Sequence, residues 1–270
     1  KNAVARNQQL DDTAFARRTA LLAAPCGHAT LGRLRSGAGL AASCLATLEF
    51  LGIPPQEGTV AIQGFGGLAA GAAYFLHKAG VRIVGLADRE KSLFSINGTP
   101  LDIPALLAAQ EDGEKGIIPI AENVKSAYSD NRKIYDIRCD IFVPAAIEKA
   151  VDKEAAEHIQ VKAVAGGANL AVTEEAEQIL HKRAIPVIPD MVAGCGGSLS
   201  MEGLFGPDTM PTAEDVLAHV DQKTRKIVKA MLHRSQQDNI SPREAALLLC
   251  AEAPLYPDAR PYGDLEASSF

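Results

Sequence analysis

The feature that most constrains the fold of this 270-residue chain is a glycine-rich turn directly after a short β-type run. Thr59–Gln63 reads Thr-Val-Ala-Ile-Gln, and residues 64–69 continue as Gly-Phe-Gly-Gly-Leu-Ala, which fits the pattern G-x-G-x-x-A. Gly64 allows a sharp turn out of the strand, Gly66 allows a phosphate to approach the backbone, and Ala69 allows the next helix to pack closely. The free N–H groups and positive dipole end of that helix would face the phosphates. The turn therefore predicts dinucleotide binding.

A carboxylate stands where this pattern expects one. A second apolar run, Arg82–Ala87, ends at Asp88, 22 residues after Gly66. A carboxylate in this position bonds the adenosine ribose hydroxyls and disfavours a 2′-phosphate, whereas Arg89 and Lys91 could receive that phosphate. We therefore expect NAD as the cofactor and keep NADP as the alternative.

Strand and helix signals alternate around this turn. Strands are expected at residues 59–63, 82–87, 141–143, 161–164 and 187–188, with a hairpin-like excursion around Asn97-Gly98. Helices are expected at residues 11–23, 39–51, 67–78, 103–109, 149–157, 174–183, 213–236 and 242–251, and residues 24–34 are expected to form a loop. Such alternation predicts an α/β, Rossmann-type fold: a doubly wound, mostly parallel sheet with flanking N- and C-terminal helices.

Composition narrows the class of protein. A net charge of −6 and a pI near 5.6 argue against a dedicated nucleic-acid or membrane-surface protein. No stretch reaches the roughly 18 apolar residues of a membrane span, and no signal peptide is recognised at the start. The five cysteines and six histidines show no metal-ligand spacing. We expect a cytoplasmic protein with reduced thiols, no metal site and neither nucleic acid nor membrane as a partner.

Several short motifs occur in a fixed order along the chain. They lie at residues 32–39, 58–88, 139–146, 165–169, 188–190, 196–197 and 243–246. Together they resemble the cofactor-binding domain of the glutamate/leucine/phenylalanine/valine dehydrogenases, over roughly residues 30–252. The resemblance implies NAD(P)-dependent, reversible oxidative deamination of an L-amino acid to a 2-oxo acid, and a homo-oligomer.

The same resemblance assigns roles to individual residues. The pyrophosphate would lie against Gly64, Phe65, Gly66, Gly67 and Leu68. Asp88, with Arg89 beside it, would meet the adenosine ribose. Ala145 and Ala146 would flank the cofactor, and Asn169 and Ser36 would lie near its nicotinamide half. Ser198 stands where the family has an apolar residue near the substrate.

Departures from the family pattern bear on catalysis. The family's catalytic Lys and Asp belong to a substrate domain that precedes the cofactor domain, but only about 30 residues precede the resemblance here, and no Gly-Gly-x-Lys segment occurs. Gly194 replaces the family's Asn before the Gly-Gly pair, Ser198 replaces an apolar residue, and Gly166 replaces a Glu. We therefore assign no catalytic residue in this chain.

Three hypotheses follow. We favour an amino-acid dehydrogenase whose substrate domain is missing from this sequence; the alternatives are an oxidoreductase with an altered substrate and a non-catalytic dinucleotide-binding or interaction module. The expected organisation has residues 1–52 as a segment and linking helix, a remnant of or hinge to a substrate domain. Residues 53–205 form the NAD(P)-binding domain, and residues 206–270 form a helical region and tail. Cys195 is a minor candidate nucleophile, and the acids Glu174–Glu175 are better explained as partners of a helix dipole.

Overall fold

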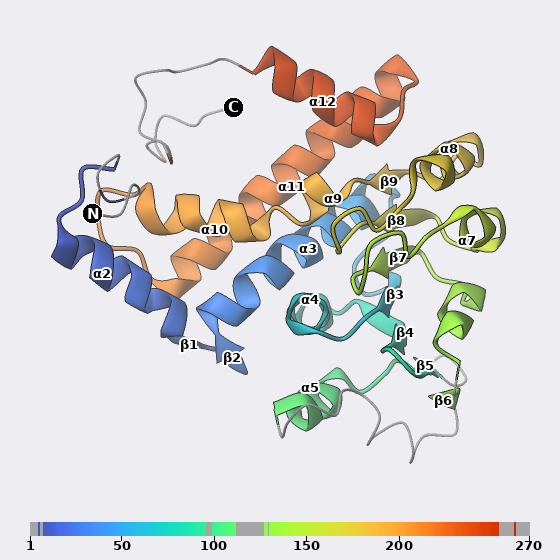
Figure 1. Ribbon diagram of the computed structural model, residues 1–270, viewed down its shortest axis with the longest axis horizontal. Coiled ribbons are helices and arrows are strands. Elements are labelled where there is room, and N and C mark those ends of the chain that lie inside the picture. Colours follow the sequence, from blue (N-terminus) through green and yellow to red (C-terminus); the bar gives the residue numbers. More distant parts are fainter. Residues whose placement is uncertain are drawn as a thin grey trace.

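The computed structural model describes residues 5, 8–95, 99–111, 127–128, 130–253 and 262, and its centre is a mixed β-sheet. Within these residues the sheet has seven strands in the order β6-β5-β4-β3-β7-β8-β9, which run from bottom to top in Figure 1. The strands are β3 (Thr59–Gln63), β4 (Arg82–Ala87), β5 (Ser92–Phe94), β6 (Ala127–Tyr128), β7 (Ile141–Pro144), β8 (Ala163–Ala165) and β9 (Val187–Ile188). Neighbouring strands pair in parallel along the series β4, β3, β7, β8 and β9. Strands β5 and β6 extend the sheet beyond β4 by antiparallel pairing. The predicted Rossmann-type fold is confirmed.

Strand β3 lies where the direction of strand succession reverses. The chain passes from β3 to β4 on one side and later returns to place β7 on the other side of β3. In open parallel sheets, ligands bind outside the carboxyl ends of the strands at such a switch point. The end of β3 is also the glycine-rich turn, so topology and sequence select the same place.

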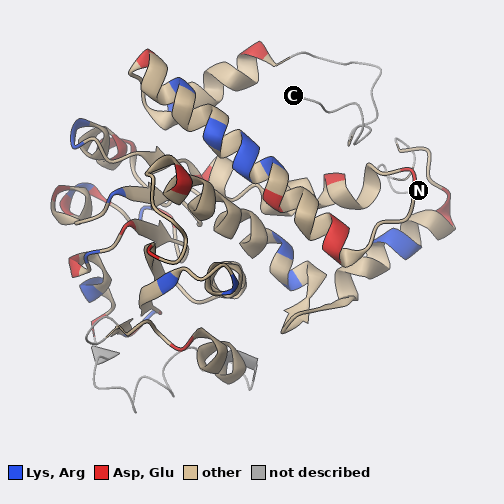
Figure 2. Cartoon of the chain, turned by 180° about the vertical axis from the view of Figure 1, so that it is seen from behind, with Lys and Arg blue, Asp and Glu red and all other residues tan. Residues whose placement is uncertain are grey.

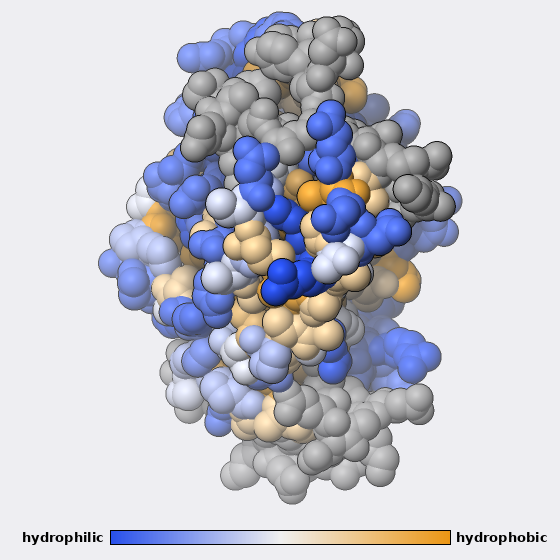
Figure 3. Space-filling view, turned by 90° about the vertical axis from the view of Figure 1, so that its left-hand side faces the viewer, coloured by the Kyte–Doolittle hydropathy of each residue, from blue (hydrophilic) through white to orange (hydrophobic). Residues whose placement is uncertain are grey.

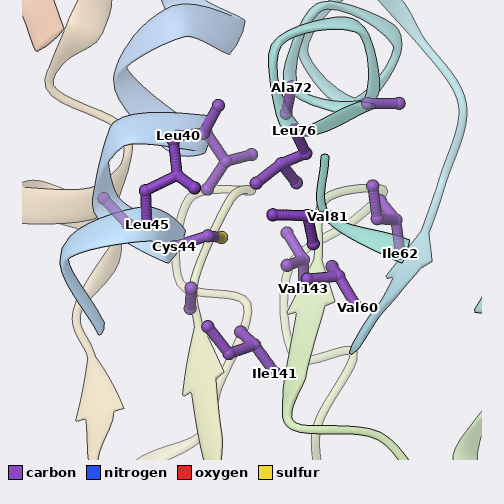
Figure 4. Packing of buried hydrophobic residues seen from close by; sticks show 14 of the residues in the cluster. Leu40, Cys44, Leu45, Val60, Ile62, Ala72, Leu76, Val81, Ile141 and Val143 are labelled. Atoms are coloured by element: carbon purple, nitrogen blue, oxygen red, sulfur yellow. The ribbon is translucent and has the colours of Figure 1, made fainter. Parts of the chain in front are cut away.

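Helices cover both faces of the sheet. One face packs against α3 (Leu31–Phe50) and α4 (Gly67–Lys78), with α5 (Ile103–Glu111) beside α4. The other face packs against α7 (Lys153–His158) and α8 (Glu174–Lys182). Side chains alternate along β3, so Val60 and Ile62 join the first cluster and Ala61 joins the second. Figure 4 shows Leu40 and Leu76 from the two helices meeting over these strands.

Helix α3 is longer than the sequence predicted. Residues 24–34 were expected to form a loop, but β1 (Pro25–Cys26) and β2 (Ala29–Thr30) form a hairpin and the helix begins at Leu31. Each internal glycine costs a helix about 1 kcal/mol in propensity. Packing overrides this cost, because a Cβ on Gly37 would lie 2.5 Å from the α4 backbone, and one on Gly39 would lie 2.5 Å from Gly196 Cα.

The remaining helices pack around α3 and at the β9 edge of the sheet. They are α2 (Asp12–Ala20), η1 (Leu21–Ala23), α9 (Asp190–Ala193), α10 (Gly196–Phe205), α11 (Ala213–Asp238) and α12 (Pro242–Glu252). Buried Arg18 of α2 donates hydrogen bonds to the carbonyl oxygens of Leu204 and Pro207, and Phe15 stacks on Phe205 at 5.4 Å. The N-terminal helix is thereby fixed to α10 and the loop before α11.

Further elements differ from those expected. Helix α7 begins at Lys153 and not near residue 149, because Lys149 has a φ of 52° and Val151 forms a bridge with Val172. The 3-10 helix η2 (Asn131–Asp136) was not predicted. The expected turn at Asn97-Gly98 and most of the tail, residues 254–270, lie outside the described residues. The three-part division of the chain stays a prediction.

Charged residues of both signs are distributed along the chain, with several basic residues on α11 (Figure 2). Several of them join helices, for example Lys229 with Glu49 of α3 at 2.7 Å. Figure 3 looks from the side of α2 and the β1–β2 hairpin and shows hydrophilic residues interspersed with small hydrophobic patches. In the described part of the chain, no helix is long and apolar enough to span a membrane.

The Asp140 carboxylate joins the amino ends of β3, β7 and β8. It accepts hydrogen bonds from Thr59 N at 2.8 Å and Thr59 Oγ1 at 2.6 Å, and it pairs with Lys162 Nζ at 2.9 Å. Burial raises its pKa, but the hydrogen bonds from Thr59 and Lys162 outweigh burial and hold the pKa below its ordinary value. The stabilisation is therefore present above the unfolded pKa of about 3.9 and is lost as pH falls through the folded pKa.

We expect Asp140→Ala to reduce the free energy of unfolding at pH 7 by about 1–3 kcal/mol, because Thr59 N–H loses its charged acceptor. Urea denaturation at pH 7 and at successively lower pH measures this. The difference between wild type and variant should narrow below about pH 4. A difference that stays constant down to pH 3 would contradict the assigned role.

Candidate functional site

The turn between β3 and α4 is shaped by Gly64. Its φ of 100° lies in the region that favours glycine, and a Cβ there would lie 3.0 Å from backbone atoms of Ala145 and Ala146. Its N–H donates to Ala87 O at 2.7 Å. Gly64 thus lies between the carboxyl ends of β4 and β7 and brings them together.

The next two glycines have a different environment. Gly66 and Gly67 are exposed, and a Cβ on either residue would meet no atom within 4 Å. Ala69, in the first turn of α4, is fully buried, as the close packing of helix on sheet requires. The space over Gly66 and Gly67 therefore lies outside the protein and is available to a ligand.

The start of α4 has no side-chain cap, in contrast to α7 and α8, the helices that follow β7 and β8. Asp152 caps α7 by accepting from Ala155 N, and Thr173 caps α8 by accepting from Ala176 N. Gly66, the N-cap of α4, provides no side-chain acceptor. The first N–H groups of a helix lack partners within it, and the dipole makes this end positive. The end of α4 can therefore receive an anion.

Asp88 follows β4 at the same edge of the sheet. Its Oδ1 accepts hydrogen bonds from Glu90 N at 2.9 Å and Lys91 N at 2.8 Å, which closes a turn over residues 88–91. Asp88 N also donates to Lys91 O at 3.0 Å. The carboxylate is therefore held in place by its own turn. The Arg89 side chain is exposed beside it.

The loops after β7 and β8 complete this edge. Ala145 N donates to Gln63 O at 2.8 Å, and Ala146 is exposed. The N–H groups of Gly167 and Ala168 both donate to Pro144 O at 3.0 Å, which holds the β8 loop against the end of β7 and leaves Asn169 exposed. The structure thus brings the loops of Gly64, Ala145 and Asn169 together.

Ser36 and Ser198 lie on the helices beside this edge. Ser36 is half-buried on α3, and its Oγ lies 3.2 Å from the position of a Cβ on Gly197, at the start of α10. Ser198 is exposed in the first turn of α10. One turn after Ser36, Leu40 contacts Gly167 of the β8 loop. Ser36 therefore faces the start of α10, on the helix that approaches the β8 loop, and Ser198 directly follows Gly197.

Other predicted residues contribute in a more limited way. The Phe65 side chain is 5% exposed and belongs to the hydrophobic core, so only its backbone can face a ligand; Leu68 is half-buried.

Burial raises the pKa of the Cys195 thiol, which opposes its use as a nucleophile. Glu174 and Glu175 lie in the first turn of α8, as their interpretation as dipole partners predicted. Among the described residues, no three His, Cys, Asp or Glu side chains gather as metal ligands.

Sequence reasoning missed the residues behind the site. Gln63, Asn131 and Tyr135 connect η2 to the segments that carry Asp88 and Gly64. No sequence signal identifies them, since residues 130–136 read Asp-Asn-Arg-Lys-Ile-Tyr-Asp, without helical or strand periodicity.

Comparison with known proteins decides the family. Residues 32–253 match the family model described as Glutamate/Leucine/Phenylalanine/Valine dehydrogenase. The chain belongs to this family. It is 34% identical over 164 residues to the glutamate dehydrogenase of Thermotoga maritima, a match covering 60% of this chain and 38% of the relative.

Further relatives carry cofactor names. A catabolic NAD-specific glutamate dehydrogenase of Bacillus subtilis is 34% identical over 146 residues, covering 54% of this chain and 33% of the relative. An NADP-specific glutamate dehydrogenase of Saccharolobus shibatae is 34% identical over 138 residues, covering 51% and 31%. The hetero-hexameric glutamate dehydrogenase of Thermus thermophilus, solved in a Leu-bound form, shares the fold. It aligns with a TM-score of 0.70 and 23% identity, over 83% of this chain and 54% of that chain.

These family members are longer than the region they share with this chain. The matches cover 31–38% of the relatives of Thermotoga, Bacillus and Saccharolobus named above, and 54% of the Thermus structure. The range matched by the family model, residues 32–253, contains the sheet, the glycine-rich turn and almost all of α3, and therefore the candidate site.

The surroundings of Gly64 and Gly67 predict effects of different size for the same substitution. We expect Gly64→Ala to lower the free energy of unfolding by about 2–4 kcal/mol, through backbone strain and contact with residues 145 and 146. Gly67→Ala, in the open first turn of α4, should change it by about 1 kcal/mol or less. Chemical denaturation of both variants measures this. Equal destabilisation would contradict the described geometry.

Proposed function

We propose that this chain is the NAD-binding part of an amino-acid dehydrogenase. The observation that carries the proposal is the uncapped start of α4 at the sheet's switch point, where Gly66 and Gly67 leave the space outside the backbone empty. Backbone N–H groups at a helix start bind phosphate well. A pyrophosphate fits there, because no protein atom lies where the side chains of those residues would be.

The proposed arrangement of the cofactor uses the site residues named above. The N–H groups at the start of α4 would bind the pyrophosphate, and Asp88 would bind the adenosine ribose. Ala145 and Ala146 would flank the cofactor. Asn169 and Ser36 would contact the nicotinamide half, near β8 and α10. NAD, when bound, supplies the hydride acceptor, and the chain supplies orientation and electrostatics.

NAD is the proposed cofactor over NADP because of the position of Asp88. The turn over residues 88–91 fixes one carboxylate oxygen, so the charge cannot swing away from an incoming 2′-phosphate without breaking two hydrogen bonds. Exposed Arg89 keeps NADP as the alternative. The related enzymes include NAD-specific and NADP-specific members, so the family alone does not select one cofactor.

For the whole protein we propose reversible oxidative deamination of an L-amino acid to a 2-oxo acid. This reaction needs a base for the amine proton and a cation for the substrate carboxylate. No Gly-Gly-x-Lys segment occurs in the chain. Both groups would therefore come from a substrate domain outside this sequence, within a cytoplasmic homo-oligomer.

Two alternatives rest on specific residues. Gly194 and Ser198 occupy positions where the family pattern has Asn and an apolar residue, which favours an oxidoreductase with an altered substrate. A non-catalytic dinucleotide-binding or interaction module is the second alternative, because Gly194 and Ser198 depart from the family pattern. Reduction of NAD by the longest natural form of the protein, tested across a panel of amino acids, separates these possibilities. NAD binding without turnover of any amino acid would favour the module.

Gly66→Ala tests the pyrophosphate site directly. A methyl group there projects into the proposed ligand space, so we expect the dissociation constant for NAD to rise about tenfold or more, which is about 1.4 kcal/mol. Lys78→Ala is the control, because Lys78 is exposed at the opposite end of α4. Isothermal titration calorimetry of both variants provides the measurement. Equal affinities in wild type and Gly66→Ala would contradict the proposal.

Asp88→Ser tests the choice of cofactor. Serine can still accept a hydrogen bond in the turn over residues 88–91 but removes the negative charge. We expect the ratio of the NADP to the NAD dissociation constant to fall about tenfold, which corresponds to about 1.4 kcal/mol of lost electrostatic discrimination. Tighter binding of NADP than of NAD by the wild-type chain would overturn the assignment of NAD.

A further inference from the structure

The 3-10 helix η2 contacts three segments that reach the candidate site. It lies against the face of the sheet that α7 and α8 cover, with Ile134 fully buried in that cluster. Its side chains form hydrogen bonds to the end of β3, the turn after β4 and the loop after β7. These are the three neighbouring strands at the switch point of the sheet.

The first contact is between Asn131 and the turn that follows β4. Asn131 Nδ2 donates to Arg89 O at 2.7 Å, within the turn whose N–H groups hold the Asp88 carboxylate. The adjacent residue, Asp130, is tied to the sheet as well, because Ser92 Oγ of β5 donates to its carbonyl oxygen at 2.8 Å. The position of residues 88–91 therefore depends on η2 in addition to β4.

The second contact is between Tyr135 and the ends of β3 and β7. The Tyr135 hydroxyl accepts from Gln63 Nε2 at 2.9 Å and donates to Ala150 O at 2.5 Å. Gln63 directly precedes Gly64, and its carbonyl oxygen accepts from Ala145 N. Gln63 Oε1 is buried and has no hydrogen-bond partner among the described residues. The Tyr135 hydroxyl is thus the group that fixes this amide.

The Tyr135 ring is itself well fixed. It packs on Phe142 of β7 with ring centroids 5.5 Å apart, and the Arg132 guanidinium lies 5.6 Å from its centroid. Removing the hydroxyl would therefore leave the ring in place and change only the two hydrogen bonds. The hydrogen bonds of the hydroxyl can therefore be removed without changing the packing of the ring.

We infer that η2 is a rigid support for the adenosine half of the cofactor site, with Asn131 and Tyr135 as positioning residues. Neither side chain needs to touch the cofactor. Asn131 fixes the turn that presents Asp88, and Tyr135 fixes the strand ends on either side of Gly64. The inference rests on the proposed function, since it assumes that a dinucleotide binds at this edge.

Two variants and a matched control test the inference in the full chain. We expect Tyr135→Phe and Asn131→Ala each to raise the dissociation constants for NAD and ADP-ribose about three- to tenfold, the effect of one lost neutral hydrogen bond. Lys133→Ala is the control, because Lys133 lies on η2, is about half exposed and pairs with Asp136 of the same helix. It should leave both constants unchanged.

A second measurement distinguishes positioning from general destabilisation. Asn131→Ala should lower the ratio of the NADP to the NAD dissociation constant, because the Asp88 carboxylate is less firmly held; Tyr135→Phe should leave the ratio unchanged. A general loss of stability would weaken both cofactors equally in both variants. Thermal unfolding confirms that the variants are folded, and if one fails to fold, the other still tests the contact on its own segment.

The outcomes separate this inference from the proposed function. If Asn131→Ala and Tyr135→Phe both bind NAD with the affinity of the wild-type chain, the role of η2 is overturned and the proposed function is unaffected. Failure of the wild-type chain to bind NAD and ADP-ribose would overturn the proposed function and this inference together. Weaker binding by both variants, with the control unchanged, would support it.

Discussion

The site depends on the absence of a side chain at Gly64. At this residue the backbones that follow β3 and β7 approach so closely that a Cβ would lie 3.0 Å from Ala145. The chain then enters α4 with its first N–H groups at the same edge of the sheet. Protein atoms fill the space around Gly64 but leave it empty around Gly66 and Gly67. Gly64 is thus required by the close approach of the two backbones, whereas Gly66 and Gly67 leave room for a ligand.

Helix α3 connects this site to the rest of the molecule. Its glycines permit backbone contact with α4 at Gly37 and with α10 at Gly39, and close helix crossings of this kind need small residues on both sides. At the start of the helix, Leu31 belongs to a third hydrophobic cluster with Leu204 and Phe205. The N-terminal helix α2 reaches that cluster through Phe15 and Arg18. The described N-terminal segment is therefore packed into the same body as the sheet.

The sequence was informative where local chemistry and topology agree. The strand before Gly64, the helix after Gly67 and the strand ending at Ala87 have the predicted bounds. The sequence led to a wrong prediction where tertiary contacts determine the secondary structure. The start of α3 is an example, because helix–helix packing there outweighs the low helix propensity of glycine. The hydrogen bonds of Asn131 and Tyr135 could not be predicted, because they join segments distant in sequence through a short 3-10 helix. The roles of Asn169, Ser36 and Ser198 stay predictions, since the structure establishes their positions and not a ligand beside them.

A crystal structure of the chain with NAD tests the central claim most directly. The account predicts the pyrophosphate at the start of α4, with its oxygens about 2.7–3.2 Å from the backbone nitrogens of Gly67 or Leu68. It also predicts the adenosine ribose within hydrogen-bond distance of Asp88. A pyrophosphate bound at any other edge of the sheet, with the space over Gly66 empty, would contradict it.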